Sequence, residues 1–131
     1  MRLLLDTRVW VWSLLEPERL TKRVQAALES PDAELWLSPL SVWQLLVMIE
    51  AGHVVVDAEP ATWIGEALRA VPVREATLSH EVARRGHLLR MRGVDVTGRL
   101  LAATAQVYDL TLITADRRLE STKEVHILAN R

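Results

Sequence analysis

Two aspartates stand directly after short apolar runs, near opposite ends of the 131-residue chain. Asp6 follows the run at positions 3–5, and Asp116 follows the run at positions 112–115. Buried parallel strands read as continuous apolar runs, and ligands of open α/β sheets bind beyond the strands' carboxyl ends. Two carboxylates meeting at one such edge suit a divalent cation, so we predict a shared site. Each aspartate is also a good cap for the helical turn that follows it.

The segments around these acids alternate between strand-like and helix-like patterns. Strand patterns occur at residues 2–5, 34–37, 111–114 and 125–128, with a brief extended piece at 54–56. Helical patterns occur at residues 9–15, 20–30, 41–51, 61–70, 78–89 and 96–108, and a turn at 117–120. This alternation predicts an α/β fold in which helices flank a parallel sheet.

Composition indicates one domain. Half of the residues are apolar and no linker divides the chain, which predicts a single domain over residues 1–131. The net charge of −1 gives no general attraction to nucleic acid or membrane, so such a partner must be met by a local patch. The chain has no cysteine, which excludes disulfides and thiolate metal sites and fits a reducing compartment. We expect a cytoplasmic protein with no membrane partner, since no apolar run is long enough for a signal peptide or a membrane span.

Four segments carry a family resemblance: LLLDTRVWVW from Leu3, LSPLSVWQLL from Leu37, GRLLAATA from Gly98 and LITADRRL from Leu112. In order and spacing they resemble the PIN-domain family, and most of all the bacterial toxin ribonucleases of VapC type. The resemblance implies a three-layer α/β/α sandwich with a central parallel sheet. It also implies a Mg²⁺- or Mn²⁺-dependent RNA-cleaving site built from acidic residues, an antitoxin protein as partner, and a homodimer.

The resemblance assigns the acidic positions one by one. The first and last family acids match Asp6 and Asp116. The family's glutamate, in a pattern like S-x-W-E, falls on Gln44, and its central aspartate, in a pattern like D-P-x-D-R, falls on Gly98. The other aspartate of the second pattern is present as Asp95. The candidate catalytic positions are therefore the three aspartates, with Gln44 a weak candidate and Gly98 the position of a missing acid.

The loss of two acids predicts a weaker metal site. A pair of unit charges 4 Å apart is worth about 4 kcal/mol at an effective dielectric near 20, before desolvation is subtracted. Magnesium is nevertheless often held by one or two carboxylates together with water and phosphate. We therefore expect one Mg²⁺ or Mn²⁺ at Asp6 and Asp116 rather than two, and RNA cleavage that is weakened or lost. The alternative is a non-catalytic PIN-like module that binds RNA or an antitoxin.

Two of these positions also have structural explanations. Ser41 followed by Gln44 has the spacing of a capping box, in which the two side chains satisfy the backbone of a helix start. Asp95 stands where it would cap the helix predicted at 96–108.

Arginines gather in one part of the sequence. Between positions 84 and 99 there are five arginines and a single acid, a composition that suits either phosphate contacts or a solvated helix face. Three further arginines, Arg8, Arg117 and Arg118, stand beside the two aspartates. Our candidates for RNA contact are Arg8, Arg92, Arg99 and Arg117.

The aromatic composition is uneven, with five tryptophans and no phenylalanine. Core packing is the favoured interpretation for Trp10, Trp12, Trp36 and Trp43, and base stacking or a partner surface are the alternatives.

Overall fold

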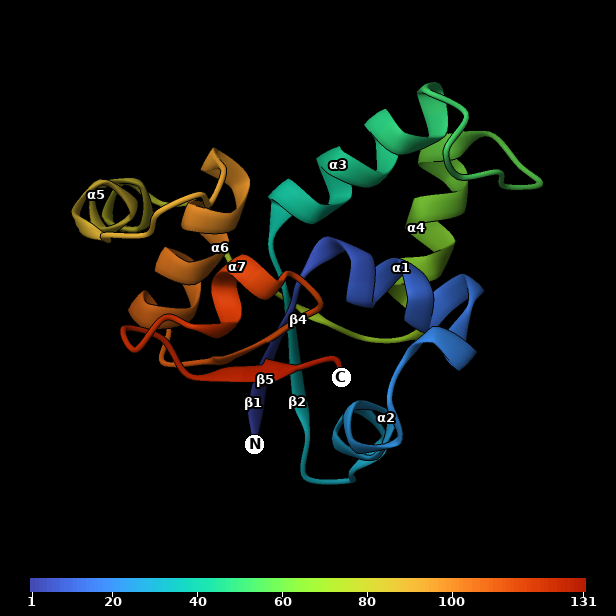
Figure 1. The fold of residues 1–131 in the computed structure, drawn as a ribbon. Helices are drawn as coiled ribbons and strands as arrows, with labels where there is room; N and C mark the ends of the chain where they lie inside the picture. The colour runs from blue at the N-terminus through green and yellow to red at the C-terminus, as the bar shows by residue number, and fades with distance from the viewer.

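The computed structural model describes residues 1–131, and its centre is a five-stranded parallel sheet (Figure 1). The strands lie in the order β3-β2-β1-β4-β5. Their bounds are β1 (Arg2–Leu5), β2 (Glu34–Leu37), β3 (Arg74–Glu75), β4 (Thr111–Thr114) and β5 (Ile127–Ala129). The chain places β2 and β3 on one side of β1, and β4 and β5 on the other. The junction between β1 and β4 is therefore where the strand order reverses, the position at which open α/β sheets bind ligands.

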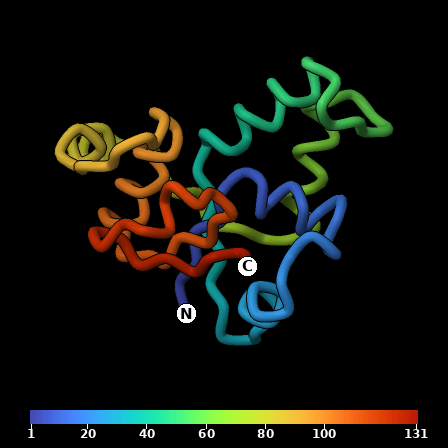
Figure 2. The backbone as a smooth tube through the Cα atoms, in the orientation of Figure 1, coloured from blue at the N-terminus to red at the C-terminus, as the bar shows by residue number.

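Helices cover both faces of the sheet (Figure 2). One group comprises α1 (Thr7–Leu15), the 3₁₀ turn η1 (Pro17–Arg19), α2 (Lys22–Glu29), α3 (Pro39–Glu50) and α4 (Pro60–Ala70). The other comprises α5 (His80–Leu88), α6 (Val96–Val107) and α7 (Arg117–Glu120). The predicted three-layer α/β/α sandwich is confirmed.

Successive residues of β1 separate the two hydrophobic cores. Leu3 and Leu5 pack with residues of α1, α2, α3 and α4, whereas Leu4 packs with residues of α5, α6 and α7. All three leucines are at most 2% exposed. Side chains alternate between the faces of a strand, so a fully apolar strand indicates burial on both sides, as found here.

Most predicted elements are found close to their expected positions. The strands at 2–5, 34–37 and 111–114 have the predicted bounds, and the helices and β5 begin and end within two residues of them. The predicted turn at 117–120 is the short helix α7. No helix combines the length and apolar composition that crossing a bilayer requires.

The extended piece predicted at 54–56 is not a strand of the sheet, since Val54 lies in a bend and residues 55 and 56 belong to no helix or strand. Val55 is 85% exposed. The strand that pairs with β2 is instead β3, in register Trp36 to Arg74 and Leu37 to Glu75. Both residues of β3 are charged and exposed, so its sequence carries no apolar pattern.

Candidate active site

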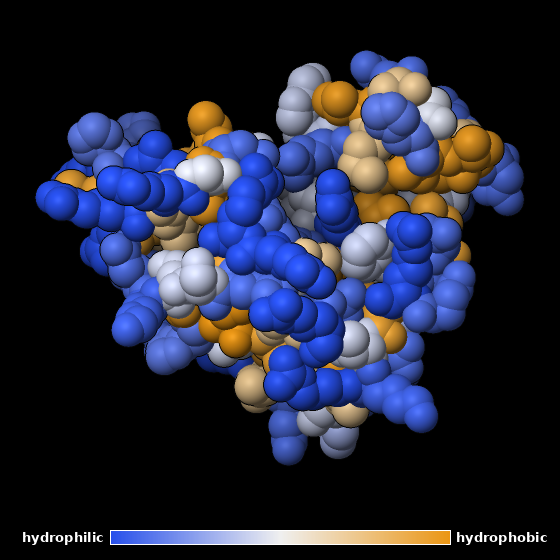
Figure 3. Space-filling model, viewed as in Figure 1, coloured by the Kyte–Doolittle hydropathy of each residue, from blue (hydrophilic) through white to orange (hydrophobic).

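A cleft of about 680 Å³ opens at the carboxyl ends of β1 and β4. Residues of α3 line one side, and residues of α6 and α7 line the other. Figure 3 shows a notch at the top of the molecule between these two groups of helices. All five positions assigned from the sequence line this cleft: Asp6, Gln44, Asp95, Gly98 and Asp116.

Asp6 lies at the floor of the cleft and is 7% exposed. Its backbone N–H donates to the carbonyl of Ile113 at 3.0 Å, which extends the pairing of β1 with β4 by one residue. Its carboxylate caps α1, because Oδ1 accepts from the backbone N–H of Val9 at 2.8 Å. Oδ2 accepts from Thr114 Oγ1 at 2.5 Å and from the backbone N–H of Ala115 at 3.1 Å. The capping function and the place in the cleft therefore coexist.

Burial dominates the electrostatics of Asp6. Desolvation raises the pKa of its carboxyl above the ordinary value, although the hydrogen bonds from Thr114, Val9 and Ala115 and the charge of Arg8 act in the opposite direction. No cationic side chain forms an ion pair with it. A cation bound at Asp6 would therefore supply a charge that the protein itself does not place in contact with this carboxylate.

Asp116 has the opposite environment. It caps α7, and its two oxygens are paired with the guanidinium of Arg118: Oδ1 with Nε at 3.0 Å and Oδ2 with Nη2 at 2.8 Å. The hydrogen bond from Arg118 is the main reason that the pKa of Asp116 is lowered. Arg118 Nη1 also donates to the carbonyl of Gly93 at 3.0 Å, which ties α7 to the loop before α6. The guanidinium of Arg118 is therefore paired with a carboxylate that the sequence predicts as a metal ligand.

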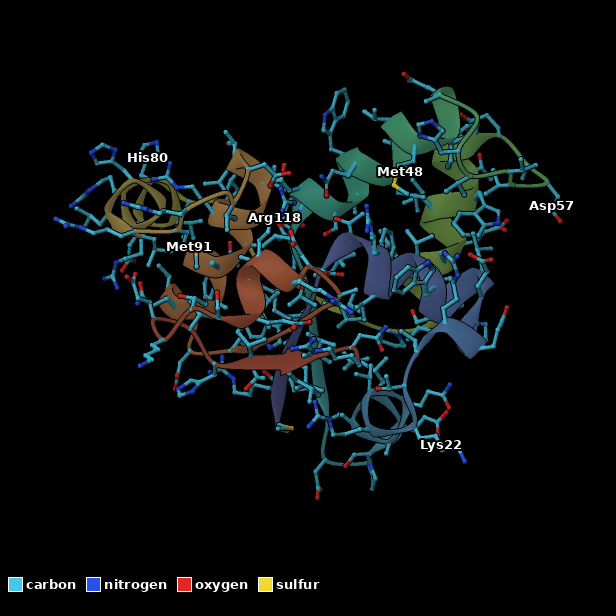
Figure 4. The ribbon with its side chains drawn as sticks, in the orientation of Figure 1. Lys22, Met48, Asp57, His80, Met91 and Arg118 are labelled. Atoms are coloured by element: carbon cyan, nitrogen blue, oxygen red, sulfur yellow. The ribbon has the colours of Figure 1, made fainter.

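Arg118 is the residue whose role the sequence did not indicate. Figure 4 shows it with Met48 on the two sides of the cleft. Two arginines follow Asp116, and nothing in their spacing tells which of them turns back to the carboxylate.

Gln44 has a different partner from the predicted one. The capping box of Ser41 and Gln44 is wrong, because α3 begins at Pro39 and its cap is Ser38, whose hydroxyl accepts from the backbone N–H of Leu40 at 3.1 Å. The proline supports this earlier start, since it is well tolerated in a first helical turn. The side-chain carbonyl of Gln44 instead accepts a hydrogen bond from Thr7, whose hydroxyl also lies 2.9 Å from that of buried Ser41.

Asp95 and Gly98 are neighbours at the start of α6. The cap predicted for Asp95 is confirmed, because its Oδ1 accepts from the backbone N–H of Gly98 at 2.8 Å. Gly98 is buried, and a Cβ atom there would lie 2.7 Å from Val94 Cγ1 and 3.1 Å from Asp95 Oδ1. An aspartate at position 98 therefore requires Val94 to move.

The four candidate RNA-contacting arginines divide into two pairs. Arg8 and Arg117 line the cleft, are exposed, and form no hydrogen bond or ion pair. Arg92 and Arg99 do not line it. Arg99 donates from Nη2 to the carbonyl of Gly86 at 2.8 Å and so joins α6 to α5. RNA contact by Arg92 and Arg99 stays a prediction.

The four tryptophans considered above differ in burial. Trp10 is 2% exposed and belongs to the core, as predicted, and Trp12 and Trp36 are partly buried against the two cores. Core packing is wrong for Trp43, which is 64% exposed and lines the cleft.

The structure brings few side chains together that could ligate a single metal ion. No group of three or more Asp, Glu, His or Cys side chains is arranged to hold one metal ion. The carboxylates of the cleft thus form a smaller set than a fully enclosed protein site requires.

The raised pKa of Asp6 makes the stability of the metal-free protein depend on pH. A carboxyl whose pKa is higher in the folded than in the unfolded protein binds more protons when folded. The free energy of unfolding should therefore fall as pH rises from the ordinary carboxyl pKa of about 4 through the folded value. Urea titrations in EDTA should show the wild-type protein losing stability relative to Asp6→Asn across this range. Parallel pH profiles of the two proteins would contradict a desolvated carboxylate.

Comparisons with known proteins identify relatives of this chain. A family profile described as PIN domain matches residues 3–125. Ribonuclease VapC22 of Mycobacterium tuberculosis (strain ATCC 25618 / H37Rv) is 31% identical over 121 residues, which cover 90% of this chain and 89% of that protein.

Solved structures share the fold at lower identity. A toxin–antitoxin complex from Klebsiella pneumoniae matches with a TM-score of 0.71 and 18% identity, covering 98% of this chain and 97% of that one. DNA-bound VapBC from Salmonella typhimurium matches with a TM-score of 0.68 and 15% identity, covering 100% and 99%. The profile match and the similarity to VapC22 together establish the family: the chain belongs to the PIN-domain family and is related to its VapC toxin ribonucleases.

Proposed function

We propose that this protein is a toxin-type PIN endoribonuclease whose metal-dependent cleavage of RNA is weakened. The observation that carries the proposal is the state of the acidic cleft. Asp6 is available to a cation, Asp116 is shared with Arg118, and the positions of two further acids hold Gln44 and Gly98.

The donor atoms fit one hard cation. Oxygen ligands alone suit Mg²⁺ or Mn²⁺. Asp6 Oδ1 accepts one hydrogen bond and keeps a lone pair, and Asp116 is reachable when Arg118 gives way. A second ion lacks charged ligands at these two positions, because the side chain of Gln44 is neutral and Gly98 has no side chain. When bound, the ion would polarise the phosphodiester and lower the pKa of an attacking water.

The protein's own groups perform the remaining tasks. The three hydrogen bonds from Val9, Thr114 and Ala115 fix the direction of the Asp6 carboxylate. Arg8 and Arg117 are free to bind the negative charge of the RNA backbone. Asp95 adds a third carboxylate to the cleft, although one of its oxygens is used to cap α6.

The second candidate is a PIN-like module that binds without cleaving. The environment of Gly98 favours it, because Val94 and Asp95 pack into the space that an acid's Cβ would need. Under this alternative the arginines of the cleft bind RNA, or the cleft receives a partner protein.

Partners and location are part of the same proposal. Several solved relatives of this fold are toxin–antitoxin complexes, which supports an antitoxin as partner of this chain. We also propose a homodimer, which the family resemblance implies. A cytoplasmic location is proposed in keeping with the absence of cysteine.

Restoring the missing acids should restore cleavage. We expect little RNA cleavage by the wild-type protein with Mg²⁺ or Mn²⁺, and at least about a tenfold gain, or about 1.4 kcal/mol in the barrier, in a Gln44→Glu, Gly98→Asp variant that also carries Val94→Ala. The last change makes room for the new Cβ. Cleavage of a labelled single-stranded RNA measures the rates.

The control adds Asp6→Asn to the restored variant, which should be silent because the remaining buried ligand is lost. Robust cleavage by the wild-type protein, abolished by Asp6→Asn, would contradict the weakened site. If the restored variant binds no metal and stays silent, the family assignment of these positions is wrong.

Arg118 should compete with the cation for Asp116. Arg118→Ala is expected to raise the affinity for Mn²⁺ severalfold, because it frees both oxygens of Asp116. Arg117→Ala is the matched control, since it removes the same charge from the preceding residue without breaking an ion pair. Titration of Mn²⁺ followed by electron paramagnetic resonance measures both. Equal effects of the two substitutions would show that only the net charge matters.

A further inference from the structure

Trp43 combines exposure with a place in the cleft. It lies on α3 with 64% of its surface exposed, and it forms no aromatic stacking, cation–π contact or hydrogen bond. Single exposed hydrophobic residues are common on protein surfaces, so exposure alone assigns no role. What distinguishes Trp43 is that it lines the same cleft as the candidate catalytic carboxylates.

The cleft also contains two cations without partners. Arg8 and Arg117 are exposed, line the cleft, and form neither an ion pair nor a hydrogen bond. The charge of Arg8 lowers the pKa of both Asp6 and Asp116, which places its guanidinium near the two acids. The cleft therefore presents, beside its three aspartates, a flat aromatic ring and two positive charges without partners.

Gln44 adds a polar donor to the same cleft. Its carbonyl oxygen accepts from Thr7, whereas its amide nitrogen donates to no group of the protein. That amide keeps two N–H groups for a base edge or a phosphate oxygen.

We propose that Trp43 is a stacking platform for one base of a single-stranded RNA whose phosphates are bound by Arg8 and Arg117. This inference rests on the proposed function and narrows its substrate to RNA with unpaired bases. A base inside a duplex is covered on both faces by its neighbours, whereas an unpaired base can stack on an aromatic side chain. Stacking platforms flanked by cations are the general form of single-strand binding sites.

Charge favours RNA over a protein segment as the occupant. An apolar protein segment would cover Trp43 and the neighbouring exposed Val47, but it would leave the two arginines unpaired. A polyanion with aromatic bases satisfies the ring and both cations together.

Binding of a labelled 12-nucleotide single-stranded RNA in EDTA tests the proposal, since EDTA prevents cleavage. We expect Trp43→Ala to weaken binding about five- to a hundredfold, in line with stacking on one base, and Trp43→Phe to retain most of the affinity. Val55→Ala is the control, because Val55 is 85% exposed and lies outside this cleft. Circular dichroism should show the same fold in every variant.

Two further measurements separate stacking from charge. Abasic sites in the RNA should weaken binding to the wild-type protein and have no further effect on Trp43→Ala. Arg8→Ala and Arg117→Ala should each reduce the salt slope of binding by about 0.7, the value for one phosphate contact on a single strand. Trp43→Ala should leave this slope unchanged.

These measurements distinguish failure of the proposed function from failure of the inference about Trp43. If the wild-type protein binds no RNA, the proposed function fails and the inference with it. If binding depends on Arg8 and Arg117 but neither Trp43→Ala nor abasic sites weaken it, the inference alone is overturned and the indole belongs to a protein-binding surface.

Discussion

The pairing of β1 with β4 is the interaction on which the site depends. These two central strands lie where the strand order reverses, and the backbone of Asp6 extends their hydrogen-bonded ladder. The side chain of Asp6 then joins β4 a second time through Thr114 and Ala115. The carboxylate is thereby fixed at the floor of the cleft before any ligand binds. Asp6 is only 7% exposed, and this burial raises the pKa of its carboxyl.

The cleft is lined by three aspartates and three arginines, with the neutral residues Gln44 and Gly98 beside them. The side-chain carbonyl of Gln44 accepts a hydrogen bond from Thr7, and Gly98 has no side chain. Arg118 neutralises Asp116 from within the protein. Arg8 and Arg117 remain without partners, and in our proposal they bind an RNA backbone. The proposed weak cleavage and the proposed RNA binding would both follow from this arrangement, and the exposed ring of Trp43 would give that binding a place for a base.

The sequence predicted much of the fold because burial leaves a pattern. Three strands that are apolar on both faces were located with their bounds, and the five acid-related positions do share one cleft. The charged edge strand β3 was missed, since pairing without burial leaves no apolar signal. The partners of Gln44 and Arg118 depend on which way side chains turn, and neither spacing nor propensity encodes that. The exposure of Trp43 was misjudged for the same reason, because an apolar helix gave no indication of which face lies in water.

The central claim is that the cleft keeps a partial metal site centred on Asp6. Its most direct test is a Mn²⁺ titration of the wild-type protein, followed by electron paramagnetic resonance, with Asp6→Asn and Asp95→Asn measured beside it. The account predicts one weakly bound ion per chain, lost in Asp6→Asn and largely retained in Asp95→Asn, whose side chain still caps α6. Two tightly bound ions, or binding that survives Asp6→Asn, would contradict it.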